Sequence, residues 1–350
     1  MDPYDFDYDL LVELTETHGP PGYEGNVRDI VRRELEDEVD RLESDAMGNV
    51  VGTVEGETDH EVVVAAHMDE IGFMVRRVDE KGFVAIDALG GWDPEVLRAQ
   101  RVVVQTEQGK LPGVIGSVPP HTGGSEDDDE REVHDVRVDV GLPKDEVEER
   151  IDVGDLVTVD QRTEPLGVCI SGKSIDNRVS VFALLELARR VDDPTATIHL
   201  VATVQEEVGL RGAQTIGSDL DPDLALALDT TVANDLSDFD EYDHVTDLGE
   251  GAAIKLKDSS VITNRKVHRR LREVAEREDI DHQFEVLPTG GTDTGGLQRA
   301  QGSVPVGAVS IPTRYLHTPT EVAHADDISG AIDLTAAFLA SEDGTHDYTL

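Results

Sequence analysis

The chain has 350 residues, with 75 Asp and Glu against 30 Lys and Arg, so its formal net charge is −45. A field this negative repels the phosphates of nucleic acids and anionic membrane surfaces, which excludes both as partners. Apolar residues still make up 38% of the chain. That is enough to bury a core, so the acidity indicates a charged surface on a globular protein and not disorder.

The acidic residues occur along the whole chain, and only 7 of the 30 basic residues are Lys. This composition is typical of proteins from halophilic archaea, whose cytoplasm holds molar salt. At about 1 M salt the Debye length is roughly 3 Å, so most of the repulsion among the excess carboxylates is screened. We therefore expect a halophilic protein whose fold or assembly loosens at low salt.

The N-terminal segment, residues 1–8, lacks the basic region and apolar core of a signal peptide. No apolar run in the chain approaches the roughly 18 residues that a membrane span needs. These features predict a cytoplasmic protein. The single cysteine, Cys169, rules out an internal disulfide and a thiolate zinc cluster, and we expect it to be a small buried side chain.

The first helical periodicity covers residues 7–40 and is broken by Gly19-Pro-Pro-Gly22, and strand-like sequence resumes at Asn49. Residues 71–164 contain short β segments separated by Gly, Pro and Asp turns, with one short helical stretch near 145–151. The expected strands are 73–78, 83–88, 101–106, 114–118, 136–140 and 156–159. We expect a small β-barrel-like domain, in which the highly charged residues 121–132 form a mobile loop.

After Pro165 long helices alternate with buried strands, a pattern typical of a mainly parallel α/β sheet flanked by helices. The expected helices are 177–191 and 267–277, and the expected strands are 197–204, 224–228 and 305–311. The simplest architecture is an α/β domain built from residues 1–70 and 165–350. Residues 71–164 then form a β domain inserted into it.

Several buried strands end in residue types that bind metal ions. The residues concerned are His67, Asp69, Glu206, Glu207, Asp229 and, after a short connection, His317. The carboxyl ends of parallel strands share one edge of a sheet, where ligands bind. Asp176 precedes the helix at 177–191, where an N-cap is the ordinary role for an isolated Asp. As a group, these residues predict a metal site.

Two His and three carboxylates suffice for two ions if one carboxylate is shared, because each ion then has three protein ligands and an open position. Two ions about 3.5 to 4 Å apart can share a water molecule and polarise a carbonyl group. Either Glu206 or Glu207 then acts as general base while its neighbour binds metal. Asp69 can hold the His67 imidazole in the required tautomer.

The motifs around these residues resemble those of the tetrahedral aminopeptidases, a self-compartmentalising family of dinuclear metallopeptidases. The matching segments are Gly19-Pro-Pro-Gly-Tyr-Glu24, His67-Met-Asp69-Glu-Ile-Gly-Phe, Ser174-Ile-Asp176-Asn-Arg, Gln205-Glu206-Glu207-Val-Gly-Leu-Arg-Gly-Ala, Asp229, Gly290-Gly-Thr-Asp-Thr294 and Arg314-Tyr-Leu-His317-Thr-Pro. They extend over nearly the whole chain. The resemblance implies a zinc-exopeptidase-like fold and an aminopeptidase acting on peptides.

The resemblance also implies a role for each site residue. His67 and Asp229 hold one divalent ion, Glu207 and His317 hold the other, Asp176 bridges them, Glu206 is the general base, and Asp69 is a catalytic acid behind the metal ligands. The two ions are Zn²⁺ or Co²⁺, since imidazole and carboxylate ligands suit both. The inserted β domain corresponds to a dimerisation domain, whose dimers assemble into a hollow tetrahedral dodecamer.

The substrate pocket is expected beside the Gly290, Gly291 and Thr292 loop and the segment of Tyr315 and Leu316. A phosphate-binding role for this Gly-rich loop is disfavoured, because the Gly-Lys-Ser/Thr ending of a P-loop is absent. The sequence does not specify which N-terminal amino acid is removed.

Two other functions compete with the aminopeptidase. A dinuclear N-acyl amino acid deacylase or dipeptidase has similar motifs, but its extra domain is inserted after the Glu-Glu pair. Here the insertion lies between Asp69 and Asp176, which favours the aminopeptidase. A non-catalytic metal-dependent scaffold would need the metal ligands but would not need Glu206.

Overall fold

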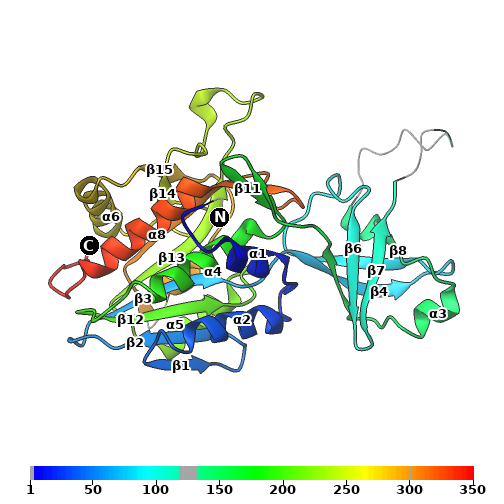
Figure 1. Ribbon diagram of the computed structural model, residues 1–350, viewed down its shortest axis with the longest axis horizontal. Helices are drawn as coiled ribbons and strands as arrows, with labels where there is room; N and C mark the ends of the chain where they lie inside the picture. Colours follow the sequence, from blue (N-terminus) through cyan, green and yellow to red (C-terminus); the bar gives the residue numbers. More distant parts are fainter. Residues whose placement is uncertain (1–3, 118–120, 122–131, 300–301) are drawn as a thin grey trace.

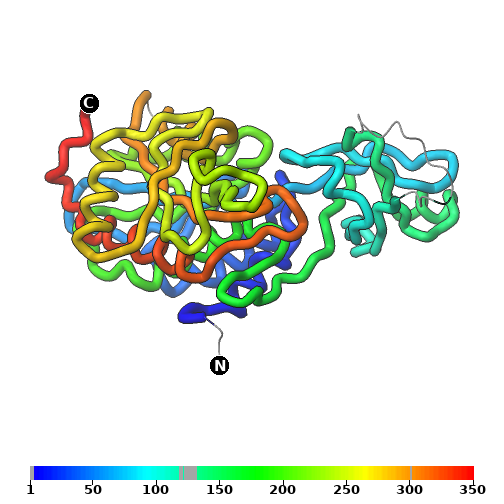
Figure 2. The backbone as a smooth tube through the Cα atoms, turned by 90° about the horizontal axis from the view of Figure 1, so that it is seen from above, coloured from blue at the N-terminus to red at the C-terminus, as the bar shows by residue number. Residues whose placement is uncertain are grey.

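The computed structural model describes residues 4–117, 121, 132–299 and 302–350. A large sheet covered by helices forms one body, and a closed β barrel projects from one end of it (Figures 1 and 2). The α/β architecture with an inserted barrel is therefore confirmed. The acidic segment expected to be a mobile loop, 121–132, lies outside the described residues except for its two end residues.

Parallel strands form the centre of the large sheet, as predicted. They are β12 (Thr197–Thr203), β3 (Glu61–His67), β13 (Leu224–Val232) and β16 (Val306–Arg314), in that spatial order. Antiparallel strands extend both sides. These are β1 (Arg41–Ser44) and β2 (Val50–Val54) on one side, and β17 (Glu321–His324), β11 (Cys169–Gly172) and β10 (Glu164–Leu166) on the other. Of these only β2, where strand-like sequence resumes at Asn49, was expected. β14 (Ala252–Lys257) pairs with both β16 and β15 (His282–Val286).

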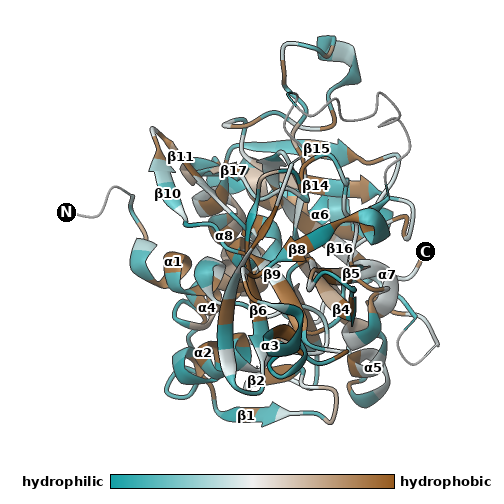
Figure 3. Ribbon diagram, turned by 90° about the vertical axis from the view of Figure 1, so that its right-hand side faces the viewer, coloured by the Kyte–Doolittle hydropathy of each residue, from teal (hydrophilic) through white to brown (hydrophobic). Residues whose placement is uncertain are grey.

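Helices cover both faces of this sheet. Alternate residues of β3 show the two layers, because Val62, Val64 and Ala66 join one apolar cluster whereas Val63 and Ala65 join another. The first cluster includes α1 (Tyr8–Glu16), α2 (Gly25–Leu35), α4 (Ile175–Ala188), α6 (Arg265–Glu278) and α8 (Ala325–Ala340), and the second includes α5 (Arg211–Asp219) and α7 (Thr294–Leu297). Helices α1 and α2 change between hydrophilic and hydrophobic along their length, as amphipathic helices do (Figure 3). Among the described residues, no helix is long and apolar enough to cross a membrane.

The barrel closes in the order β4, β5, β8, β7, β6, β9 around its own apolar core. Its strands are β4 (Gly72–Val78), β5 (Val84–Leu89), β6 (Arg101–Thr106), β7 (Gly109–Ile115), β8 (Arg137–Asp139) and β9 (Leu156–Val159). The short helix α3 (Lys144–Glu148) and the 3-10 turn η2 (Val133–Asp135) belong to this body, and η3 (Glu241–Asp243) to the other. The strands agree with the sequence pattern, except that β7 begins at Gly109, earlier than expected.

Buried hydrogen bonds join the barrel to the N-terminal segment. The Nδ1 atom of His18 lies 2.8 Å from the hydroxyl of Thr158 in β9, and the two hydroxyls of Thr15 and Thr163 are 2.7 Å apart. Burial, reinforced by the nearby Lys173 ammonium, lowers the pKa of His18 to about 4. His18 is therefore neutral in the folded protein near pH 7.

The cysteine is more exposed than the sequence predicted. Cys169 is half-buried in β11.

The buried His18 should make the fold sensitive to moderate acid. The unfolded chain binds a proton below its ordinary pKa near 6.5, whereas the folded chain does not until about pH 4. This stabilising contribution is complete above pH 6.5 and is lost as the pH falls. Between about pH 7.5 and pH 5, urea unfolding should show the wild type losing about 2 kcal/mol more than His18→Gln. The half-exposed His134→Gln is the control, and equal pH dependence of wild type and His18→Gln would contradict this assignment.

Candidate metal centre

The ends of the central strands bring the predicted residues together. His67 is the last residue of β3 and pairs with Thr203 of β12, after which the chain continues to Glu206 and Glu207. The parallel register of β13 against β3 pairs Ala227 with Ala65. Two residues further along both strands, Asp229 comes level with His67, which places the two side chains at the same edge.

Asp176 lies between two histidines. It is in the first turn of α4 but has non-helical φ and ψ of −74° and 109°. Its Oδ1 atom is 3.4 Å from Nε2 of His67, and its Oδ2 atom is 3.4 Å from Nε2 of His317. Each carboxylate oxygen therefore faces one imidazole, and the N-cap role that an isolated Asp would have is not what the structure shows.

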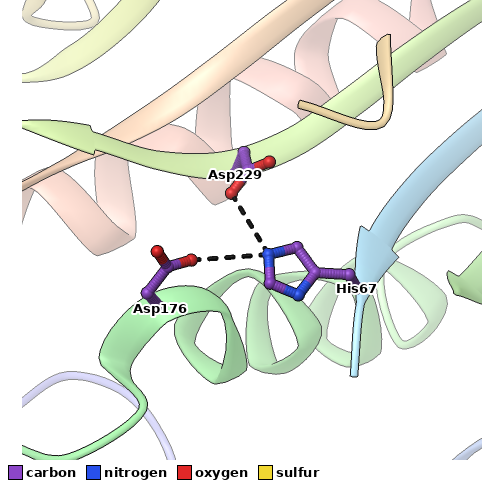
Figure 4. Close-up of side chains that lie close together, drawn as sticks. All are labelled: His67, Asp176 and Asp229. Atoms are coloured by element: carbon purple, nitrogen blue, oxygen red, sulfur yellow. Dashed lines mark ion pairs between the residues drawn. The ribbon is translucent and has the colours of Figure 1, made fainter. Parts of the chain in front are cut away.

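The remaining ligand candidates divide between the same two histidines. Asp229 Oδ1 is 3.7 Å from Nε2 of His67 (Figure 4), and Glu207 Oε2 is 3.5 Å from Nε2 of His317. Potential ligand atoms lie within 4.8 Å of one another in the groups His67, Asp176, Asp229 and Asp176, Glu207, His317. His67, Glu206 and Glu207 form a third such group, in which Glu206 is 3.9 Å from His67.

Both imidazoles present a free nitrogen to the carboxylates. The Nδ1–H of His67 donates to the main-chain carbonyl of Asp69 at 3.1 Å, and that of His317 donates to the carbonyl of Gly91 at 2.9 Å. Because a main-chain carbonyl engages Nδ1 of each ring, Nε2 is the nitrogen that faces the carboxylates and is available to a metal ion. This is the usual arrangement of metal-binding histidines.

The buried carboxylates of the cluster also favour the binding of cations. Burial, together with neighbouring carboxylates such as Asp229, raises the pKa of Glu206 well above its ordinary range, and burial raises the pKa of Glu207 to about 8. The Oδ1 atom of Asp176 is buried and has no hydrogen-bond partner among the described residues. Buried carboxylates are normally paired or bound to metal. The donor set of imidazole nitrogen and carboxylate oxygen therefore fits divalent ions such as zinc.

Three successive main-chain amides of the Glu206 segment are held by carboxylates. The Glu24 carboxylate accepts from the amide of Gln205 at 3.2 Å. The Asp69 carboxylate, which is fully buried, accepts from Glu206 at 3.0 Å and from Glu207 at 3.1 Å. Asp69 is thus hydrogen-bonded mainly to this backbone, while its carboxylate is 3.6 Å from Nδ1 of His67. These bonds fix the backbone from which the side chains of Glu206 and Glu207 extend.

Glu321 of β17 holds two other ligand candidates in the same way. Its buried carboxylate accepts from the amide of Asp176 at 2.9 Å and from the amide of His317 at 2.8 Å. His317 has a φ of 59°, and Ser174, which precedes the Asp176 turn, has a φ of 48°. Left-handed conformations of this kind persist only when surrounding contacts impose them. Glu321 supplies such contacts to both segments.

A buried ion-pair network supports the chain beneath His67. Glu70 accepts from Lys173 Nζ at 2.5 Å and from the amide of Gly19 at 3.0 Å. The fully buried Arg178 donates to the carbonyl of Met68 at 2.6 Å and to that of Thr17 at 2.7 Å. Together these bonds attach the end of α1 to the segment that follows β3.

Sequence reasoning identified the ligand candidates but missed the residues that position them. Glu24 lies in the Gly19–Glu24 motif and Glu70 directly follows Asp69, so the two motifs contained a signal that we did not use. Glu321 and Gly91 had no distinguishing signal, because their partners are distant in sequence.

A cavity of about 580 Å³ opens beside the cluster. Of the residues expected to line a substrate pocket, Gly290, Gly291, Thr292 and Leu316 do line it. Tyr315 is not part of the lining, and its side chain is 48% exposed. Gly91, which comes from the segment between the barrel strands β5 and β6, also reaches this cavity.

The protein-family model described as M42 glutamyl aminopeptidase matches residues 48–334. The chain belongs to this M42 peptidase family. It is a peptide hydrolase, as the motifs predicted, and peptidases of the M42 family are metal-dependent. It is 34% identical to the lysyl aminopeptidase of Pyrococcus furiosus over 95% of this chain and 96% of that relative.

Solved structures of M42-like peptidases share the fold. Aminopeptidase APDkam598 from the archaeon Desulfurococcus kamchatkensis superposes with a TM-score of 0.92 at 38% identity, covering 95% of this chain and 94% of that one. The Pyrococcus horikoshii TET1 peptidase, which can assemble into a tetrahedron or a large octahedral shell, gives a TM-score of 0.86 at 30% identity. That match covers 95% of this chain and 99% of that one. The resemblance to tetrahedral aminopeptidases is therefore confirmed.

Loss of the Glu321 contacts should weaken metal binding. In Glu321→Gln one carboxylate oxygen becomes an amide NH₂, which cannot accept, so either Asp176 or His317 loses its main-chain bond. Affinity for Zn²⁺ or Co²⁺, titrated calorimetrically into chelator-treated protein, should fall about 10- to 100-fold.

The matched control is Asp327→Asn. Asp327 is also buried and accepts from two main-chain amides, those of Gly249 and Gly251, both at 2.8 Å, but it holds no ligand candidate. Its variant should keep the wild-type metal affinity. Wild-type affinity in Glu321→Gln would show that the ligands hold their positions without this residue.

Proposed function

We propose that this M42 peptidase is a dinuclear metal-dependent aminopeptidase, which removes N-terminal amino acids from peptides. The observation that carries the proposal is the position of Asp176, whose two oxygens each face a different imidazole at 3.4 Å. One ion would be held by His67 and Asp229, the other by Glu207 and His317, and Asp176 would be shared between them. When bound, two such ions would lower the pKa of a water molecule and polarise the scissile carbonyl group.

Glu206 is the proposed general base. Its carboxylate belongs to the cluster without being needed for either proposed ion, and Asp69 fixes its backbone through the amide hydrogen bond at 3.0 Å. In the reaction Glu206 accepts a proton from the attacking water and delivers it to the departing amine nitrogen. The Asp69 main-chain carbonyl meanwhile keeps the proton of His67 on Nδ1.

The proposed activity requires a free N-terminus. A short peptide and its N-acetylated twin, supplied with Zn²⁺ or Co²⁺ in concentrated KCl and followed by chromatography of the products, distinguish the aminopeptidase from a deacylase. We expect release of the first amino acid from the free peptide only. Faster hydrolysis of the acetylated peptide would favour the N-acyl amino acid deacylase instead.

Removal of the general base should separate binding from catalysis. Glu206→Gln keeps the shape of the side chain but cannot accept the proton, so kcat should fall by about 10²- to 10⁴-fold. Metal content, measured by elemental analysis, and particle size should match the wild type. Unchanged turnover in this variant would remove Glu206 from the mechanism.

We also propose that the barrel mediates dimerisation and that dimers form a hollow tetrahedral dodecamer at high salt. The assembly of the Pyrococcus horikoshii TET1 peptidase supports this, as does the projection of the barrel from the main body (Figure 1).

The proposed assembly should depend on salt. With a net charge of −45 per chain, repulsion between subunits should grow as salt is removed. Light scattering should detect the dodecamer in about 3 M KCl and smaller species in about 0.1 M KCl. The same mass in both buffers would contradict the salt dependence.

A further inference from the structure

We infer that the cavity beside the metal centre selects an uncharged, aliphatic N-terminal residue such as leucine or methionine. This inference rests on the proposed aminopeptidase function and adds the class of substrate. It comes from the lining of the 580 Å³ cavity, in which the charged side chains of the described residues are confined to the metal centre. Those groups are His67, Asp176, Glu206, Glu207, Asp229 and His317.

The rest of the wall, as far as the structure describes it, is neutral and comes from several segments. The end of β13 contributes Thr230, Thr231 and Val232, and the turn before α5 contributes Gly209 and Leu210. The connection between β15 and α7 supplies Leu287 and residues 289–292, and Gly91, Ser260 and Leu316 complete the wall. A side chain that enters this space therefore meets methyl groups, hydroxyls and main-chain atoms.

Three charged residues behind this wall, Asp258, Lys255 and Glu285, are paired with one another. Asp258 accepts from the amides of Ser260 at 2.7 Å and Val261 at 2.9 Å, and it also accepts the Ser260 hydroxyl at 2.8 Å. Its other oxygen is 3.8 Å from Nζ of Lys255, which forms a close ion pair with Glu285. Asp258, Lys255 and Glu285 are all at most 3% exposed. None of them presents a charge to the cavity.

The neutral wall discriminates between substrate side chains through the free-energy cost of removing water from charged groups. A lysine ammonium or glutamate carboxylate on the substrate would lose water on entry, and the described lining offers it no opposite charge outside the metal centre. An aliphatic side chain loses nothing comparable and gains apolar contact with Leu287 and Leu316. The net charge of −45 does not rescue a lysine substrate at high salt, because at about 1 M salt long-range attraction is screened beyond roughly 3 Å.

A panel of chromogenic aminoacyl amides tests the inference. Leucine, methionine, lysine and glutamate p-nitroanilides, with N-acetyl-leucine p-nitroanilide, are compared in concentrated KCl with added Co²⁺. We expect kcat/KM for leucine and methionine to exceed those for lysine and glutamate by at least about tenfold. A preference for lysine or glutamate would overturn the substrate class but keep the aminopeptidase. Absence of cleavage of every free aminoacyl amide would overturn the aminopeptidase itself.

Introducing a charge into the wall provides a second, independent test. Thr289 is an exposed residue of the wall, so its replacement does not disturb the core. Thr289→Asp should raise the lysine-to-leucine ratio of kcat/KM at least about fivefold, because it supplies the missing carboxylate, which a lysine can pair with. The control variant Thr289→Asn, which has the shape of the Asp variant but no charge, should leave that ratio at the wild-type value. Equal ratios in the two variants would show that this wall does not contact the substrate side chain.

Discussion

The repulsion among carboxylates at one edge of the sheet is the constraint on which the rest of the structure depends. Asp176, Glu206, Glu207 and Asp229 have side chains that are at most 10% exposed and that surround two imidazoles. Without cations, such a cluster costs free energy through both desolvation and like-charge repulsion. The fold must therefore supply enough fixed geometry to hold these groups in place before any metal binds.

That geometry is supplied largely by other acids. Asp69 and Glu321 accept hydrogen bonds from the main-chain amides of cluster residues, and Glu24 accepts from the amide of the adjacent Gln205. A carboxyl group serves this purpose well because its two oxygens can accept from two amides at once. The acidic composition thus has three separate uses: solvated surface, metal ligands, and attachment of the backbone beneath those ligands.

The barrel takes part in the site as well as in the proposed assembly. The Gly91 carbonyl, on the segment between β5 and β6, orients the His317 ring, and a Cβ on Gly91 would lie only 3.0 Å from Nδ1 of that ring. The two bodies are further joined through His18 and Thr158. A displacement of the barrel would therefore reach the proposed second ion through His317. The neutral wall of the cavity comes mainly from the α/β body, and Gly91 of the barrel segment also lines it.

The sequence by itself determined the α/β class, the inserted barrel and the ligand candidates. Periodicity marks the buried strands β3, β12 and β13, and polar residues at their ends converge wherever such strands run parallel. Tertiary structure alone decided the antiparallel edges β10, β11 and β17, because short strands owe their pairing to distant partners. It also decided which of the 75 acids position the site. Glu321 has the same local sequence character as a surface acid, and only folding brings the amides of Asp176 and His317 to its carboxylate.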